Sequence, residues 1–329
     1  MTSEPHSRRL GDHGPTVTSP ALGCLGLSGG YGPTDDAQGI RTLHTYLDAG
    51  GTLLDTGDFY GSGHNEWLIR QALSARNRDA VTLSVKFGSL RGPGGTPGGN
   101  DGRPEAVRNF LSYSLQRLGV DHLDIYRPAR LDPAVPIEET VGAVAEMVEK
   151  GYVRHIGLSE VGTDTIRRAA AVAPISDVQI EYSLLSREVE DGILPVCREL
   201  GIGITAYGVL SSGLIGGSSS TGGKRAYFPR FQGANLEHNA ALVAGLEKIA
   251  AEKNATLAQL AVAWVAAQGD DVVPVVGARR PDQVGTLLDS TRLPLTSDDL
   301  TRIEALVPRG AARGERYPAA LMAELDSER

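Results

Sequence analysis

Cysteine is scarce in this sequence: Cys24 and Cys197 are the only two among 329 residues. They lie far apart and lack the spacing of a metal site, so a disulfide framework and a zinc site are both disfavoured. We expect both to be small core residues of a protein in the reducing cytoplasm, and we expect no metal.

Long apolar runs and clusters of positive charge are also missing. No apolar run approaches the roughly 18 residues that a membrane helix needs. No block of about five basic residues occurs, and the net charge of −8 argues against binding to a phosphate backbone. A soluble protein with neither a membrane nor a nucleic-acid partner is expected, and the sequence leaves its oligomeric state open.

Glycine is abundant, at 41 residues, and 41% of the chain is hydrophobic. Residues 1–14 begin with a polar stretch and are expected to form a disordered tail, whereas residues 15–329 are expected to form one domain. In that domain short runs rich in β-branched residues alternate with longer amphipathic segments. The runs that predict strands are Thr52–Asp55, Val81–Lys86, Leu123–Tyr126, Arg154–Leu158, Asp177–Ile180, Ile202–Tyr207 and Val272–Val276, with a weaker eighth candidate near Arg292–Leu295.

The segments between these runs have helical spacing and readable ends. Pro104 suits a helix start and Gly119 its end, and Thr256 with Gln259 matches a capping box. Such alternation predicts parallel strands, either in an open doubly wound sheet or in a closed barrel. No early glycine cluster follows a strand in the way that a dinucleotide-binding turn requires. The predicted fold class is therefore α/β, a single-domain (β/α)8 TIM barrel.

Two long glycine-rich loops follow predicted strands, at the face where barrel enzymes keep their active sites. The first spans Gly88–Gly102 and is either a flexible connection or a lid. The second spans Ser211–Gly223, and we favour a clasp over a bound cofactor for it. Long loops are thus expected at the C-terminal face of the barrel.

Asp55, Tyr60 and Lys86 are the strongest catalytic candidates, because they lie at or just beyond predicted strand ends. A lysine in a low-dielectric barrel mouth requires a carboxylate partner, which Asp55 could supply. A phenol beside that ammonium should have a lowered pKa. The three residues therefore predict a group that delivers a proton to a carbonyl oxygen.

The segments around these residues resemble the aldo-keto reductase family. The resemblance spans roughly residues 16–310, and the order and spacing of six motifs make it specific. The pattern favours the pyridoxal-reductase-like or bacterial xenobiotic-reductase branches. The motifs are Asp55–Gly61 with Asn65 and Glu66, Ser84–Gly88, Ile156–Glu160, Val178–Ser183, Ala206–Gly213 and Val273–Arg280.

The resemblance implies NADPH-dependent reduction of small aldehydes or ketones, with the cofactor held without a Rossmann domain. It makes Tyr60 the general acid, tuned by Lys86 and Asp55. The cofactor residues that it implies are Ser159 and Gln179 at the nicotinamide carboxamide, Tyr207 against the ring, Leu210, Ser211, Ser212 and Leu214 at the pyrophosphate, and Gly277, Arg279, Arg280 and Gln283 at the adenylate end. The two arginines suit a 2′-phosphate, which favours NADPH (NADP+) over NADH.

Besides residues 285–287, where many relatives place polar contacts to the adenine, two positions depart from the family pattern. Ala129 stands where the family presents a histidine after the third strand, so one hydrogen bond to the substrate oxygen is lost. We expect Arg127, two positions earlier, to face the same substrate pocket. Glu160 stands where many relatives have asparagine, which leaves a carboxamide contact in doubt.

Three functions are therefore weighed. The first is a reductase in which Tyr60 works without the histidine. The alternative is an NADPH-bound regulatory or sensor protein with weak turnover, which Ala129 favours. A lyase or isomerase would need a metal or phosphate site, and the sequence shows neither ligand spacing nor a phosphate loop. The physiological carbonyl substrate cannot be named from the sequence.

Overall fold

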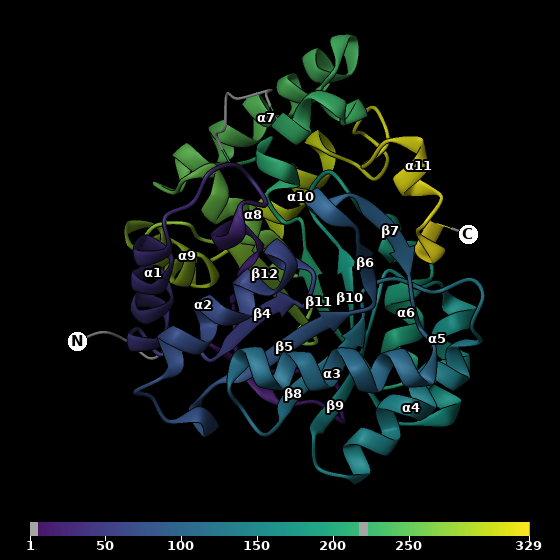
Figure 1. The fold of residues 1–329 in the computed structure, drawn as a ribbon. Helices are drawn as coiled ribbons and strands as arrows, with labels where there is room; N and C mark the ends of the chain where they lie inside the picture. The colour runs from purple at the N-terminus through teal and green to yellow at the C-terminus, as the bar shows by residue number, and fades with distance from the viewer. Residues whose placement is uncertain (1–5, 217–222, 329) are drawn as a thin grey trace.

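The computed structural model describes residues 6–216 and 223–328. Eight parallel strands close into a barrel at the centre of the molecule (Figure 1). The strands follow one another around the barrel in chain order, as successive β–α units require. They are β3 (Ala21–Gly23), β4 (Leu53–Gly57), β5 (Thr82–Phe87), β8 (Leu123–Pro128), β9 (Val153–Ser159), β10 (Ile175–Glu181), β11 (Gly203–Tyr207) and β12 (Val272–Gly277). The (β/α)8 prediction is confirmed.

All seven of the confidently placed strands belong to this barrel, but the eighth was predicted in the wrong place. The closing strand is β3, whose Leu22 pairs with Val276 of β12 and with Leu54 of β4. The candidate near Arg292–Leu295 instead begins within a 3-10 turn over Ser290–Arg292 and is not a strand. Because β3 fills the place between β12 and β4, the barrel has no opening for a later strand.

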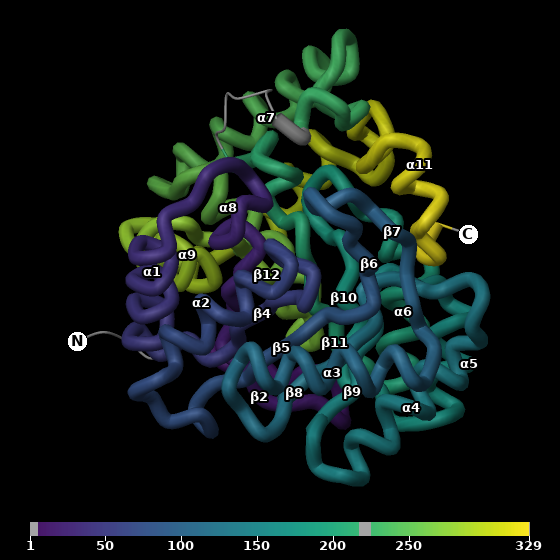
Figure 2. Tube along the Cα trace, viewed as in Figure 1, coloured from purple at the N-terminus to yellow at the C-terminus, as the bar shows by residue number. Residues whose placement is uncertain are grey.

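An outer layer of helices covers the barrel (Figure 2). Thr256 and Gln259 form the expected capping box, and Gly119 ends its helix in the left-handed conformation, with φ of 68°. The helices are α1 (Asp36–Asp48), α2 (His64–Leu73), α3 (Pro104–Leu118), α4 (Ile137–Glu149), α5 (Thr163–Val172), α6 (Ile193–Glu199), α7 (Gly233–Glu252), α8 (Leu257–Ala266), α9 (Pro281–Asp289), α10 (Ser297–Leu306) and α11 (Ala319–Met322).

The N-terminal segment is ordered from Ser7 onward, in contrast to the disordered tail expected over residues 1–14. Strand β1 (Ser7–Arg9) pairs antiparallel with β2 (Thr16–Thr18). The turn between them lies against the N-terminal end of the barrel, where a side chain at Gly11 would approach the Gly201 carbonyl to 2.4 Å. Buried Leu10 fills this end of the barrel, which explains why the segment is held. Residues 1–5 lie outside the described part.

The long connections expected at the C-terminal face are present. The segment after β5 forms a hairpin of β6 (Ser89–Arg91) and β7 (Pro97–Asn100), rather than an irregular loop. In Figures 1 and 2 this hairpin and the C-terminal segment with α11 lie on the same upper side of the molecule. Of the expected clasp over 211–223, residues 217–222 lie outside the described residues.

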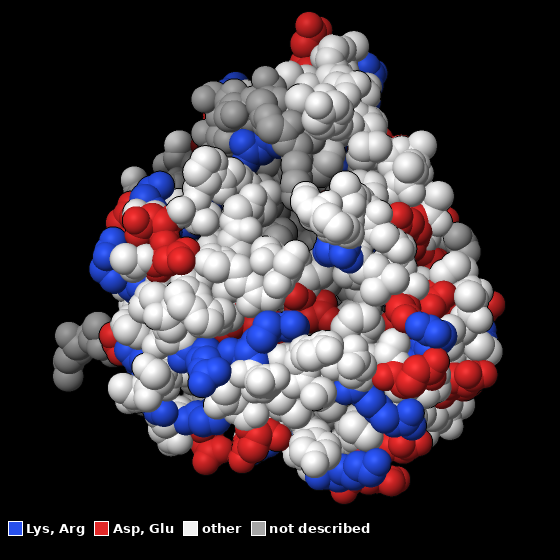
Figure 3. Space-filling view, in the orientation of Figure 1, with Lys and Arg blue, Asp and Glu red and all other residues white. Residues whose placement is uncertain are grey.

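Apolar side chains form the core in two places, between the strands and helices and inside the lower barrel. Between this inner apolar cluster and the C-terminal ends of the strands, the barrel interior holds buried polar side chains, among them Asp55, Lys86 and Arg127. Basic and acidic side chains are interspersed over the lower half of the face in Figure 3. Within the described ranges, no helix is both long and apolar enough to cross a bilayer.

Candidate active site

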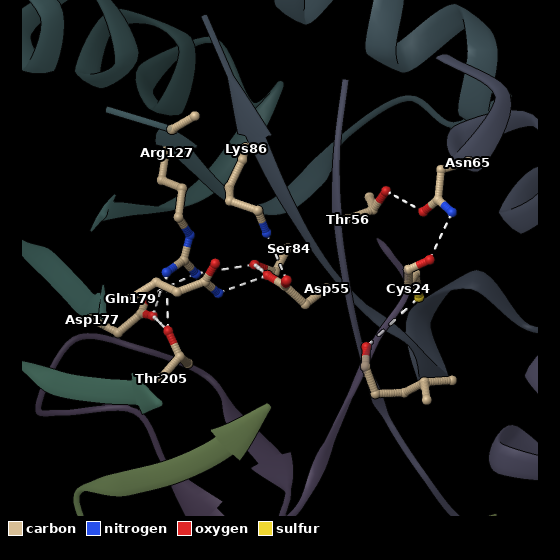
Figure 4. Close-up of polar contacts among 12 residues, drawn as sticks. Cys24, Asp55, Thr56, Asn65, Ser84, Lys86, Arg127, Asp177, Gln179 and Thr205 are labelled. Atoms are coloured by element: carbon tan, nitrogen blue, oxygen red, sulfur yellow. Dashed lines mark hydrogen bonds and ion pairs between the residues drawn. The ribbon is translucent and has the colours of Figure 1, made fainter. Parts of the chain in front are cut away.

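A buried ion pair lies where β4 and β5 reach the C-terminal end of the barrel (Figure 4). Lys86 Nζ lies 2.6 Å from Asp55 Oδ1, and the two residues are only 4% and 5% exposed. The other carboxylate oxygen of Asp55 accepts hydrogen bonds from Gln179 Nε2 at 2.8 Å and Ser84 Oγ at 3.1 Å. Burial lowers the pKa of Lys86, and Asp55 partly offsets that effect. The carboxylate therefore holds the ammonium in a fixed position.

Tyr60 stands beside this pair, in the turn that joins β4 to α2. Its ring centroid is 5.2 Å from Lys86 Nζ and 4.9 Å from the Phe59 ring, which it meets edge-on. The turn requires the left-handed backbone at Gly61, with φ of 58°. Burial, with the Asp55 carboxylate, holds the pKa of Tyr60 well above its ordinary value. The lowered pKa expected from the sequence is thus not found in this structure. The phenol keeps its proton at neutral pH.

Ala129 directly follows β8, and its N–H donates to the Phe87 carbonyl at 2.8 Å. Arg127 does not face an open substrate pocket as expected. It is completely buried inside the barrel, where Nη1 and Nη2 contact the two Asp177 oxygens at 2.7 and 3.2 Å. Its Nη2 also donates to Ser84 Oγ at 3.0 Å, which links the Arg127–Asp177 pair to Asp55 (Figure 4). The Arg127 side chain thus extends across the barrel interior to Asp177 of β10, and it is linked to Asp55 through the Ser84 hydroxyl.

The residues expected at the nicotinamide end come together at adjacent strand ends. Ser159 closes β9, and its buried Oγ has no hydrogen-bond partner within the described residues. Gln179, one strand further on, holds Asp55 through its amide nitrogen. Tyr207 closes β11 and is half-buried. An unpartnered hydroxyl, an amide oxygen and an aromatic ring therefore face one region of the barrel mouth.

The residues expected at the pyrophosphate lie in a tight turn after β11. Ser211 and Ser212 both have left-handed backbone, with φ of 47° and 55°, and Leu210 and Leu214 are half-buried beside them. Arg225 Nε donates to the Ser212 carbonyl at 2.6 Å. This arginine brings positive charge to the turn. No sequence pattern marked Arg225, because it lies beyond the glycine-rich loop.

The residues expected at the adenylate end surround the start of α9. Gln283 Oε1 accepts from the backbone N–H of Arg279 at 2.8 Å and of Arg280 at 3.2 Å, so its amide also organises the loop. Arg280 is exposed and contacts Asp282 at 3.0 Å, whereas the Arg279 guanidinium donates to backbone carbonyls of residues 31 and 33. Gly277 ends β12, next to this loop. Both arginine side chains can be reached from solvent.

The C-terminal segment adds Arg316, which sequence reasoning did not place in the site, and it brings Tyr317 to the mouth of the barrel, where sequence reasoning did expect it. Arg316 is buried and contacts Glu160 at 3.0 Å, Glu181 at 3.2 Å and also Glu328. The hydroxyl of Tyr317 lies 3.2 Å from that of Tyr207. The segment thus reaches the ends of β9, β10 and β11, where the residues expected at the nicotinamide lie. No metal-ligand cluster of His, Cys, Asp and Glu occurs in residues 6–216 and 223–328.

A closed barrel with a buried Asp–Lys pair beside a tyrosine defines a barrel oxidoreductase without a Rossmann domain. The model of the Aldo/keto reductase family matches residues 21–308. A Glycine max protein named "Probable aldo-keto reductase 1" is 41% identical over 315 residues, which cover 94% of this chain and 91% of the relative. This chain belongs to the aldo/keto reductase family and is an oxidoreductase.

Solved structures show the same fold. The glycerol dehydrogenase of Gluconobacter oxydans superposes with a TM-score of 0.85 at 29% identity, covering 96% of this chain and 98% of that one. An aldo-keto reductase from Bacillus halodurans, in a holo form, gives 0.79 at 25% identity, covering 94% and 100%. A thermostable aldo-keto reductase with the inhibitor epalrestat gives 0.75 at 26% identity, covering 92% and 99%. The fold is thus shared over nearly the whole chain.

Proposed function

We propose that this protein reduces small aldehydes or ketones with NADPH, and that Tyr60 is the general acid. The observation that carries the proposal is the buried Asp55–Lys86 pair, whose ammonium lies 5.2 Å from the Tyr60 ring. A proton donor must hold its proton until hydride arrives. The raised pKa of Tyr60, caused first by burial, meets that requirement.

The cofactor would supply the hydride that adds to the carbonyl carbon. As negative charge develops on the carbonyl oxygen, Tyr60 Oη donates its proton to it. Lys86 then stabilises the tyrosinate, because its positive charge is held within the same low-dielectric site. Asp55, Ser84 and Gln179 keep the lysine in place through their hydrogen bonds.

The residues present fit a nicotinamide cofactor. The unpartnered Oγ of Ser159 is a buried polar group without a hydrogen bond in the described chain, which is costly unless a ligand supplies one. Ser159 and Gln179 would hold the carboxamide, and Tyr207 would pack against the ring. Residues 210–214 would line the pyrophosphate, and Arg279 with Arg280 would meet the 2′-phosphate of NADPH.

The test is Tyr60→Phe, which removes one oxygen and leaves the ring. We expect NADPH oxidation against a panel of aldehydes and quinones to fall by about 10²–10⁴-fold. Binding of NADPH, measured by quenching of protein fluorescence, should stay within about twofold of the native value. Native protein that binds neither NADPH nor NADH would refute the proposal.

A second candidate is a protein that binds NADPH as a signal and turns over slowly. The absence of an imidazole at Ala129 favours it, because no donor at that position orients the carbonyl oxygen. Single-turnover kinetics separate the two candidates. Tight NADPH binding without oxidation by any carbonyl of the panel would support the second.

A further inference from the structure

Arg130 occupies the barrel mouth directly after the position that lost its histidine. Its half-buried side chain donates from Nη1 to the Ala129 carbonyl at 2.6 Å. That is its one hydrogen bond to residues of the described ranges, which also give it no ion pair within 4.0 Å. A guanidinium has five N–H donors in a planar fork. Most of the donors of Arg130 are thus open to a ligand.

Glu160, the carboxylate that interacts electrostatically with Arg130, already has other partners. Glu160 Oε2 accepts from Arg316 at 3.0 Å and from Ser327 Oγ at 2.7 Å. Its Oε1 accepts from the Glu181 backbone N–H at 2.9 Å. Burial opposes the charge of Glu160, but Arg316 outweighs it and holds the pKa of this carboxyl at about 2. Glu160 is therefore charged, but its oxygens face Arg316 rather than Arg130.

The other groups that interact electrostatically with Arg130 are the phenols of Tyr60, Tyr207 and Tyr317. Burial raises the pKa of each phenol, so all three are neutral at physiological pH. Burial also opposes the charge on Arg130, but its neighbours together hold its pKa above the ordinary value. A fixed positive charge therefore lies near these neutral phenols without a carboxylate at contact distance. Leaving such a charge partly desolvated costs free energy that an anionic ligand would recover.

We propose that Arg130 binds a carboxylate carried by the carbonyl substrate, so that the preferred substrates are oxo acids and aldehydes with an acidic group. This inference rests on the proposed reductase function and deepens it. The planar fork of arginine matches the two oxygens of a carboxylate. Anchoring the substrate through its acid group would orient the carbonyl toward Tyr60. That contact takes over the orienting role for which Ala129 has no donor.

The experiment compares 4-formylbenzoate with its methyl ester, which has the same aldehyde and lacks the negative charge. NADPH-dependent kcat/KM is measured for both substrates in native protein and in Arg130→Gln. We expect native protein to favour the acid, and Arg130→Gln to lose about 10- to 100-fold for the acid and less than threefold for the ester. Arg130→Lys, which keeps the charge but not the fork, should lie between.

The matched control is Arg103→Gln, which removes an exposed arginine paired with Asp101, and it should change neither substrate. Benzoate gives a readout that needs no turnover. With NADP+ present, it should raise the melting temperature of native protein by about 1–2 °C and leave that of Arg130→Gln unchanged. Far-UV circular dichroism checks that the variants fold.

Equal losses for acid and ester would overturn the proposal, because Arg130 would then act on every carbonyl alike. An unchanged ratio of the two kcat/KM values in Arg130→Gln would also overturn it. Either result leaves the reductase standing, since the ester is still reduced. If native protein binds NADPH and reduces neither compound nor any other carbonyl, the proposed function itself fails.

Discussion

The buried Arg127–Asp177 pair permits a test of how much a compensated charge inside the barrel contributes to folding stability. Both side chains are completely buried, and two contacts of 2.7 and 3.2 Å join them. Asp177 also accepts from Thr205 Oγ1 at 2.6 Å and Ser176 Oγ at 2.8 Å. Asp177→Asn keeps the shape of the side chain but leaves the guanidinium uncompensated inside the barrel.

We expect Asp177→Asn to lower the free energy of unfolding by about 3–5 kcal/mol, the usual cost of stranding a buried charge. The double variant Arg127→Met with Asp177→Leu removes both charges. It should recover more than half of that loss, because a buried pair replaced by apolar groups of similar volume is often nearly neutral.

The assay is urea unfolding followed by far-UV circular dichroism, with thermal melts alongside. Asp271→Asn is the matched control, since it removes the carboxylate of a partly exposed pair with Arg198 at 2.8 Å. That variant should lose less than about 1 kcal/mol. A loss as small in Asp177→Asn would refute the reasoning, because it would show that the interior of the barrel is well hydrated at this level.

Three further results are expected. Ala129→His should change kcat/KM for acidic aldehydes by less than about tenfold, because Ala129 is buried and another donor is proposed for the substrate; a rise of several hundredfold would show that the native pocket is disabled. Burial, with Glu66 nearby, raises the pKa of Asp58 from 3.8 to about 7. The folded protein therefore binds this proton more tightly than the unfolded chain does, and the resulting stabilisation is lost as the pH rises from about 4 to about 7. Melts from pH 4 to 8 should show Asp58→Asn gaining up to about 4 kcal/mol relative to native protein, and parallel curves would contradict this. Arg280→Ala should raise KM for NADPH about tenfold and leave that for NADH unchanged; an equal rise for both nucleotides would exclude recognition of the 2′-phosphate.

The fold could be predicted from the sequence wherever a strand was long enough to show its pattern. Seven runs of β-branched residues between amphipathic helices were sufficient to place seven strands. Strand β3 has only three residues, Ala21–Gly23, and no alternation that a reader could detect. It forms because the barrel needs a partner between β12 and β4, which is a property of closure rather than of local sequence.

The sequence predicted those site residues that lie at the ends of the barrel strands, but not the contacts that long side chains and the C-terminal segment make. Asp55 and Lys86 were found because side chains at the ends of barrel strands converge on one mouth. The same geometry indicated that Arg127 faces inward, but it could not say that the long side chain turns across the barrel to Asp177. Arg316 was missed because it lies 135 residues from Glu181 and 156 from Glu160, and no periodic pattern marks so distant a contact.

The departures from the family pattern at Ala129 and Glu160 follow adjacent strands, and the structure gives these two a common account. Glu160 holds a left-handed backbone, with φ of 51°, which asparagine tolerates more readily than glutamate. Its carboxylate is retained there by Arg316, so this charge is matched by the C-terminal segment rather than by a ligand. Arg130 beside Ala129 then remains as a cation at the mouth that has no carboxylate partner among the described residues. Ala129 thus offers no side-chain donor, and the Glu160 carboxylate is paired with Arg316, so the guanidinium of Arg130 is available to a ligand. Carbonyl compounds that carry an acid group are therefore the substrates to test first.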